Sequence, residues 1–210
     1  MAVIRRSFTT LNQHNFVPLY KALVRSHLDY AISIWSPYKQ KYKDAIENVQ
    51  RRATKQLPGM KNVPYEERLQ RLKLPTLAYR QTRGDMIEVY KLLHGKYDSD
   101  VSNIVKLHKD SDTREGTRGH SLKLLIERAC TNVRKESFSL RVTRLWNDLP
   151  EVVVTAPSVN SFKNRLDRHW STEEFLYNYK AALPGSRRAF QGKVEDLTTE
   201  ATAYGQEEPR

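Results

Sequence analysis

Cysteine is nearly absent from the chain, which has a single one, Cys130, in 210 residues. A single thiol excludes an internal disulfide framework and any zinc site built from several cysteines. No apolar run approaches the roughly 18–20 residues needed to cross a bilayer, and the N-terminal apolar run is too short for a secretory signal. We therefore expect an intracellular protein, cytoplasmic or nuclear, with no membrane partner.

The sequence also lacks the motifs of phosphoryl transfer. No two aspartates are adjacent, and no glycine-rich loop of the G-x-x-x-x-G-K-S/T type occurs. Two-metal catalysis needs carboxylates close enough to bridge ions about 3.5–4 Å apart. The closest aspartate pairs, Asp98 with Asp100 and Asp110 with Asp112, stand in polar stretches typical of solvated loops. The sequence thus predicts no catalytic residue, no metal ligand, no cofactor and no small-molecule substrate.

Positive charge, by contrast, is abundant. The chain has 36 Lys and Arg against 24 Asp and Glu, and residues 1–170 hold 31 and 17 of these, a net charge of +14 for that part alone. A field of this sign attracts polyanions, of which nucleic acid is the commonest. The alternative interpretation is a protein that uses lysine for solubility only.

Apolar residues recur at helical spacing along most of the chain, which predicts a mainly α-helical fold. Residues 15–34 are expected to form one amphipathic helix, with Asn15 as its N-cap and Pro18 in the first turn. A second helix is expected from about 39 to 57. Its inward face is predicted to comprise Ile46, Val49, Ala53 and Leu57. Later helices are predicted at 65–72, from Leu77 to about 93, at 137–149, and after the cap Ser158, with Phe162, Leu166 and Trp170 inward.

These elements divide the chain into four parts. Residues 1–95 are expected to form a helical bundle, and 96–119 a polar linker or loop. Residues 120–183 are expected to form a small α or α+β unit, in which the pattern of 120–133 is ambiguous and the alternation at 122–124 is compatible with a short strand. The composition of 184–210 predicts a disordered tail.

Seven basic side chains are the candidate nucleic-acid contacts. Such groups neutralise phosphates without reading the base sequence, and affinity falls steeply with salt when several act together. A solvated helix face is the alternative for each cluster. The candidates are Arg51, Arg52 and Lys55 on the outer face of the second helix, Arg80 and Arg83 on a later helix, and Arg114 and Arg118 in the polar loop.

Tyrosines are interleaved with these cations. Their rings are suited to stacking on bases or riboses, although tyrosine at such spacings more often closes the edge of a core. The sequence leaves both interpretations open for Tyr38, Tyr42, Tyr65, Tyr79 and Tyr90.

Several segments together carry a family resemblance. They are residues 15–31, 49–55 (Val-Gln-Arg-Arg-Ala-Thr-Lys), 65–69, 83–87, 117–124, 146–150 (Trp-Asn-Asp-Leu-Pro) and 156–170. In this order they resemble the region that follows the catalytic palm in reverse transcriptases of jockey-like non-LTR retrotransposons. The resemblance covers the chain from about residue 3 to 180.

The resemblance implies an RNA-directed DNA polymerase whose fingers and palm lie N-terminal to this region, with residues 1–95 as a thumb-like bundle. In that family the metal-binding aspartates belong to a Tyr/Phe-Ala-Asp-Asp motif of the palm, and no such tetrapeptide occurs here. We therefore expect that this chain is not an enzyme by itself and that Mg²⁺ would belong to the absent palm. The implied partners are RNA or an RNA–DNA hybrid, together with the fingers and palm.

Two other hypotheses stay open. The apolar surface that would face a missing palm predicts a protein-interaction or self-association module. The chain is also compatible with a non-functional relic of a transposable element.

Overall fold

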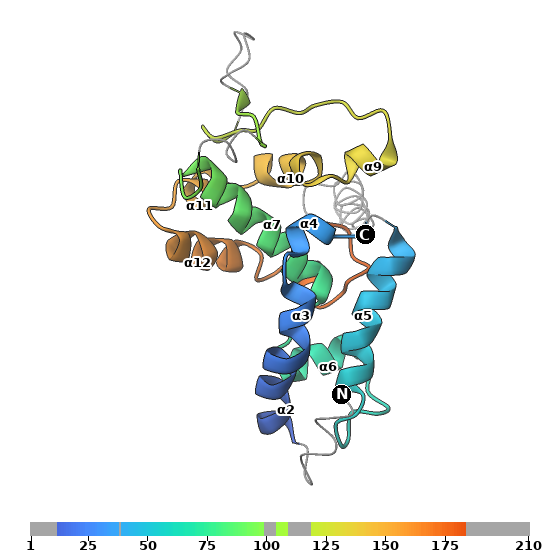
Figure 1. Cartoon of the computed structure of the whole chain (residues 1–210). Coiled ribbons are helices and arrows are strands. Elements are labelled where there is room, and N and C mark those ends of the chain that lie inside the picture. Colours follow the sequence, from blue (N-terminus) through green and yellow to red (C-terminus); the bar gives the residue numbers. More distant parts are fainter. Residues whose placement is uncertain (1–11, 38, 99–103, 109–118, 184–210) are drawn as a thin grey trace, which may run out of the picture.

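The computed structural model describes residues 12–37, 39–98, 104–108 and 119–183, and it is mainly helical, as the periodicity predicts (Figure 1). The N-terminal helices are α2 (Gln13–Tyr20), the π-helical turn η1 (Lys21–Arg25), α3 (Ser26–Asp29), α4 (Ile32–Trp35), α5 (Gln40–Thr54), α6 (Tyr65–Leu72) and α7 (Leu77–Leu93). They are followed by α9 (Asn132–Lys135), α10 (Phe138–Asn147), α11 (Glu151–Val154), α12 (Val159–His169) and the 3-10 turn η3 (Glu174–Leu176). The tail at 184–210 lies outside the described residues.

The first helix differs from its prediction because it is broken into shorter pieces. It starts earlier, since the Asn12 side chain, not that of Asn15, is the cap and accepts a hydrogen bond from the Asn15 backbone N–H at 2.9 Å. Pro18 stands inside α2 and not in its first turn. Proline removes one N–H from the helical ladder, and the ladder widens to the π-helical η1 directly afterwards. Ala31, with φ of 48°, then separates α3 from α4.

The buried face of α5 is partly polar: Ala53 and Leu57 are buried as the sequence predicts, but polar side chains are buried beside them. Glu47 and Gln50 are buried, while Val49, expected inside, is 36% exposed. The buried groups are stable there because they are paired. The Tyr65 hydroxyl donates to Glu47 at 2.6 Å, and the Tyr20 hydroxyl donates to Gln50 at 2.9 Å. These bonds fix the rotation of α5 about its own axis.

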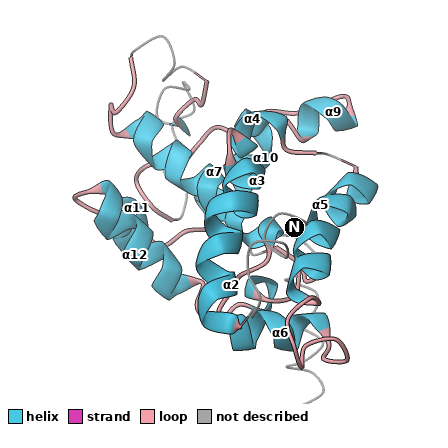
Figure 2. Ribbon diagram, turned by 60° about the horizontal axis from the view of Figure 1, so that its bottom comes forward, coloured by secondary structure: helices cyan, strands magenta, loops and turns pink. Residues whose placement is uncertain are grey.

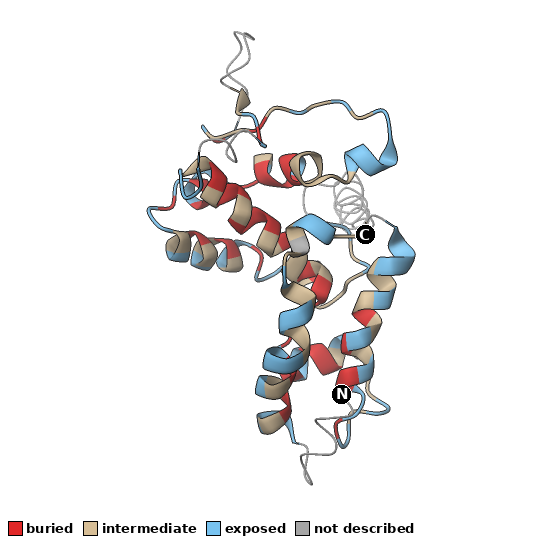
Figure 3. Ribbon diagram, viewed as in Figure 1, coloured by how far each residue is buried: buried red, intermediate tan, exposed pale blue. Residues whose placement is uncertain are grey.

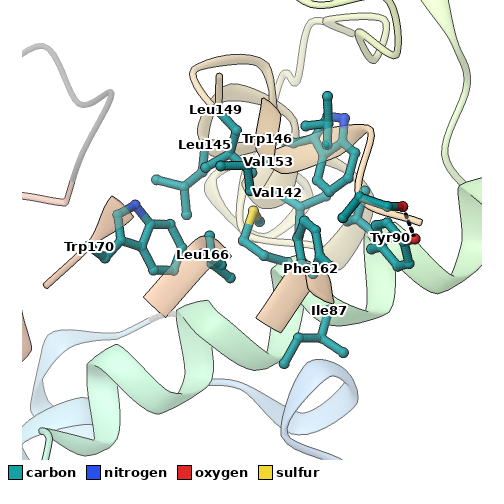
Figure 4. Close-up of a cluster of buried hydrophobic side chains, with 14 of the residues drawn as sticks. Ile87, Tyr90, Val142, Leu145, Trp146, Leu149, Val153, Phe162, Leu166 and Trp170 are labelled. Atoms are coloured by element: carbon teal, nitrogen blue, oxygen red, sulfur yellow. Dashed lines mark hydrogen bonds between the residues drawn. The ribbon is translucent and has the colours of Figure 1, made fainter. Parts of the chain in front are cut away.

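Two clusters of buried apolar side chains hold the helices together. The smaller joins α2, α5 and α6 and comprises Phe16, Tyr20, Ala53, Leu57, Leu69, Leu72 and Leu74. The larger is built on α7, against which α10 and α12 pack (Figure 4). Buried residues of α7 and of residues 142–175 belong to this one cluster, so α7 shares a core with the later helices.

Trp146 lies at the centre of the larger core and also fixes the loop before α9. Its indole N–H donates to the Leu122 carbonyl at 2.8 Å, and the ring lies 5.9 Å from that of Phe162. The short strand expected at 122–124 is reduced to an isolated antiparallel bridge between Leu124 and Leu107. Within the described ranges the chain therefore has no named strand, as the turned view in Figure 2 shows.

Candidate nucleic-acid interface

The outer face of α5 carries three exposed cations, Lys41, Arg52 and Lys55, which we call the α5 ridge. At 100° per residue these three positions lie within about 60° of one another around the helix axis. None of them forms an ion pair with any described residue. Their charges therefore face solvent without compensation.

One carboxylate lies on the same side of α5 as the ridge. Asp44 is half-buried there and accepts a hydrogen bond from the Gln40 amide at 3.0 Å, whereas Glu47, the other acidic residue of the helix, is buried. With a rise of 1.5 Å per residue, the ridge extends about 21 Å along the helix. A net positive charge over this length is suited to a polyanion.

Arg51, a candidate contact next to Arg52, is committed to the fold. Its guanidinium donates to the Tyr179 hydroxyl at 2.8 Å and to the Asn48 side chain at 2.9 Å. The same group lies 5.1 Å from the ring centre of Tyr65 and 5.3 Å from that of Tyr179. Arg51 thus ties the segment after η3 to α5.

Arg80 and Arg83 on α7 are likewise engaged within the chain. The Arg80 guanidinium donates to the Asp29 carboxylate at 2.5 and 2.9 Å, which links α7 to α3. Arg83 donates to both oxygens of Asp167 at 2.5 and 2.8 Å, which links α7 to α12, and this bonding raises its pKa. A paired guanidinium contributes little net charge to the surface. The structure therefore gives these two residues a fold-holding role.

The remaining predicted candidates give a mixed outcome. Arg114 and Arg118 lie outside the described residues. Arg52 and Lys55 are brought together on the α5 ridge, which gains a member that the sequence reasoning missed, Lys41. The helical spacing could have identified Lys41, because it precedes Arg52 by eleven residues, or about three turns, and so lies on the same face of the helix.

The tyrosines divide in a similar way. Tyr79 and Tyr90 are buried in the larger core, and burial raises the pKa of Tyr79 to about 12. Tyr65 is bonded to Glu47, and Tyr38 lies outside the described residues. Tyr42, on the first turn of α5, is 49% exposed. Among the four of these tyrosines that the structure describes, Tyr42 is therefore the one whose ring is available for stacking.

The described residues contain no group of three or more His, Cys, Asp or Glu side chains that could hold a metal ion. Over the same ranges no helix has both the length and the apolar character that a membrane span requires. In comparisons with known proteins, no protein family, no curated protein and no solved structure matches the chain. The functional argument therefore depends on the chain's own geometry and charge.

Proposed function

We propose that this chain binds nucleic acid through its phosphate backbone, as the non-catalytic C-terminal portion of a retrotransposon reverse transcriptase. The observation that carries the proposal is the α5 ridge, with three exposed cations that form no ion pair with any described residue and one half-buried carboxylate, Asp44, beside them. The ligand proposed is RNA or an RNA–DNA hybrid. The fingers and palm of the polymerase are the proposed protein partner.

A rigid helix makes the ridge suited to this task. The buried bonds of Glu47 and Gln50 hold α5 at a fixed rotation, so the ridge cations point outward without any rearrangement. The Leu77 backbone N–H, at the start of α7, donates to Glu47 at 3.0 Å and joins α5 to that helix as well. Cations held in place lose less conformational entropy on binding than mobile ones. Contacts to phosphates alone would give little base specificity.

The number of ridge cations sets the expected salt dependence. Each phosphate contact contributes about −0.7 to −0.9 to the slope of log Kobs against log salt concentration, so three contacts give about −2 to −3. Raising the salt fourfold would then weaken binding about 15- to 60-fold.

A charge reversal with a matched control tests the proposal. Arg52→Glu is expected to weaken binding to a labelled RNA–DNA hybrid about ten-fold at low salt, measured by fluorescence anisotropy. The control is Arg168→Glu, which changes the same charge at an exposed site in α12, on the opposite side of the molecule from α5 (Figures 1 and 2). Equal effects of the two substitutions would show attraction by net charge alone and would contradict the proposed interface.

A further inference from the structure

Exposed aromatic side chains flank the connection between α4 and α5. Tyr30 is 79% exposed, Trp35 40% and Tyr42 49%, whereas the other two tryptophans, Trp146 and Trp170, are buried. Burying an aromatic ring is strongly favourable, so several exposed rings within 13 residues indicate a binding surface. We call Tyr30, Trp35 and Tyr42 the aromatic patch.

The backbone under the patch is firmly held. The Trp35 indole N–H donates to the Tyr30 carbonyl at 2.5 Å, which fixes the orientation of the indole. On the other side of α4, the Arg141 guanidinium donates to the Ser33 carbonyl at 2.8 Å, and the Gln81 amide donates to the Ser36 hydroxyl. These bonds hold α4 against α7 and α10, while exposed residues remain along α4 and the start of α5 (Figure 3).

One ring of the aromatic patch, that of Tyr42, lies directly beside the α5 ridge. Tyr42 and Lys41 are neighbours in the first turn of α5, and the Lys41 ammonium lies 4.8 Å from the Tyr42 ring centre. Tyr42 follows Trp35 by seven positions, so their Cα atoms are at most about 25 Å apart. A ligand of several nucleotides is long enough to contact both the rings and the ridge.

We propose that the aromatic patch stacks on unpaired bases of a single-stranded nucleic acid whose phosphates follow the α5 ridge. This inference rests on the proposed function and adds the class of ligand. Aromatic side chains beside a line of cations are the usual means of binding single strands without sequence preference. The positive charge of the adjoining α5 ridge complements phosphates, which favours a nucleic acid over a protein as the ligand.

Tryptophan fluorescence gives a direct test, because Trp35 is the single exposed tryptophan of the three. The probes are a 15-nucleotide oligouridine and a 15-base-pair RNA–DNA hybrid, each titrated into the full chain. Stacking predicts that the oligouridine quenches the Trp35 emission and that Trp35→Phe removes the quenched component. Unchanged emission at saturating oligouridine would overturn the inference.

Affinity measurements separate this inference from the proposed function. Tyr42→Ala is expected to weaken oligouridine binding at least five-fold, with the salt slope unchanged and hybrid binding within two-fold. Tyr97→Ala, at a ring 41% exposed beyond the end of α7, is the control and should change neither. Hybrid binding that persists while Tyr42→Ala has no effect on oligouridine overturns the stacking inference alone. If the wild type binds neither probe, the proposed function is overturned as well. If Tyr42→Ala changes the self-association of the chain in the absence of RNA, the patch is a protein interface and the stacking inference is overturned.

Discussion

Arg51 and Arg52 are adjacent in α5, yet we expect their removal to have different consequences. Arg51→Ala deletes hydrogen bonds to Tyr179 and Asn48 and the contacts with two tyrosine rings. Hydrogen bonds to charged groups contribute about 1.5–3 kcal/mol and each exposed cation–π contact about 0.5–1 kcal/mol. Because Arg51 is only half-buried, we expect a loss of about 2 kcal/mol in the free energy of unfolding. For a chain of this size that lowers Tm by about 4–8 °C.

Arg52→Ala removes an exposed side chain without an ion pair among the described residues, so its unfolding free energy should change by less than about 0.5 kcal/mol. The same substitution should lower the magnitude of the salt slope of hybrid binding by about 1. Urea unfolding and fluorescence anisotropy, performed on both variants, provide the two readouts. Equal destabilisation by the two substitutions would refute the reasoning, and so would a binding loss confined to Arg51→Ala in a fully stable protein.

Two further predictions concern the larger core. Arg141→Met removes the guanidinium that donates to Asp85 at 2.9 Å, and burial already raises the pKa of that carboxyl. The free energy of unfolding, measured with urea, should therefore fall by about 3–5 kcal/mol. Arg144→Met, at an exposed site of the same helix, is the control and should lower it by less than about 1 kcal/mol. Burial lowers the pKa of His120, so the unfolded chain binds the proton more readily and stability falls as the pH drops below about 6.5, by at most about 1.4 kcal/mol per pH unit. His120→Gln retains an N–H donor for the Trp146 carbonyl and should show a shallower loss between pH 7 and 5; an identical pH profile would contradict this assignment.

The sequence predicted the elements whose apolar spacing is regular. The last predicted helix is confirmed in α12, where Ser158 accepts a hydrogen bond from the Ser161 backbone N–H at 3.2 Å and Phe162, Leu166 and Trp170 are buried. Helical periodicity is a sufficient signal there because both the cap and the packing agree with it.

The prediction of the buried face of α5 was right for Ala53 and Leu57 but missed Glu47 and Gln50 for a physical reason. Periodicity arguments assign apolar residues to the interior, but Glu47 and Gln50 are stable inside because Tyr65 and Tyr20 donate to them. Those tyrosines come from α6 and α2, so the pairing depends on tertiary structure that no local pattern encodes. The same limit explains why Arg51 and Arg52 were indistinguishable, since the partner of Arg51 is Tyr179, 128 residues away.

The salt dependence of binding tests the central claim most directly. We would measure the affinity of the wild type for an RNA–DNA hybrid between about 50 and 200 mM salt, beside a variant with Lys41, Arg52 and Lys55 all changed to Glu. The account predicts a slope of about −2 to −3 for the wild type and a slope near zero for the variant. A wild type that does not bind, or a variant that keeps the wild-type slope, would contradict it.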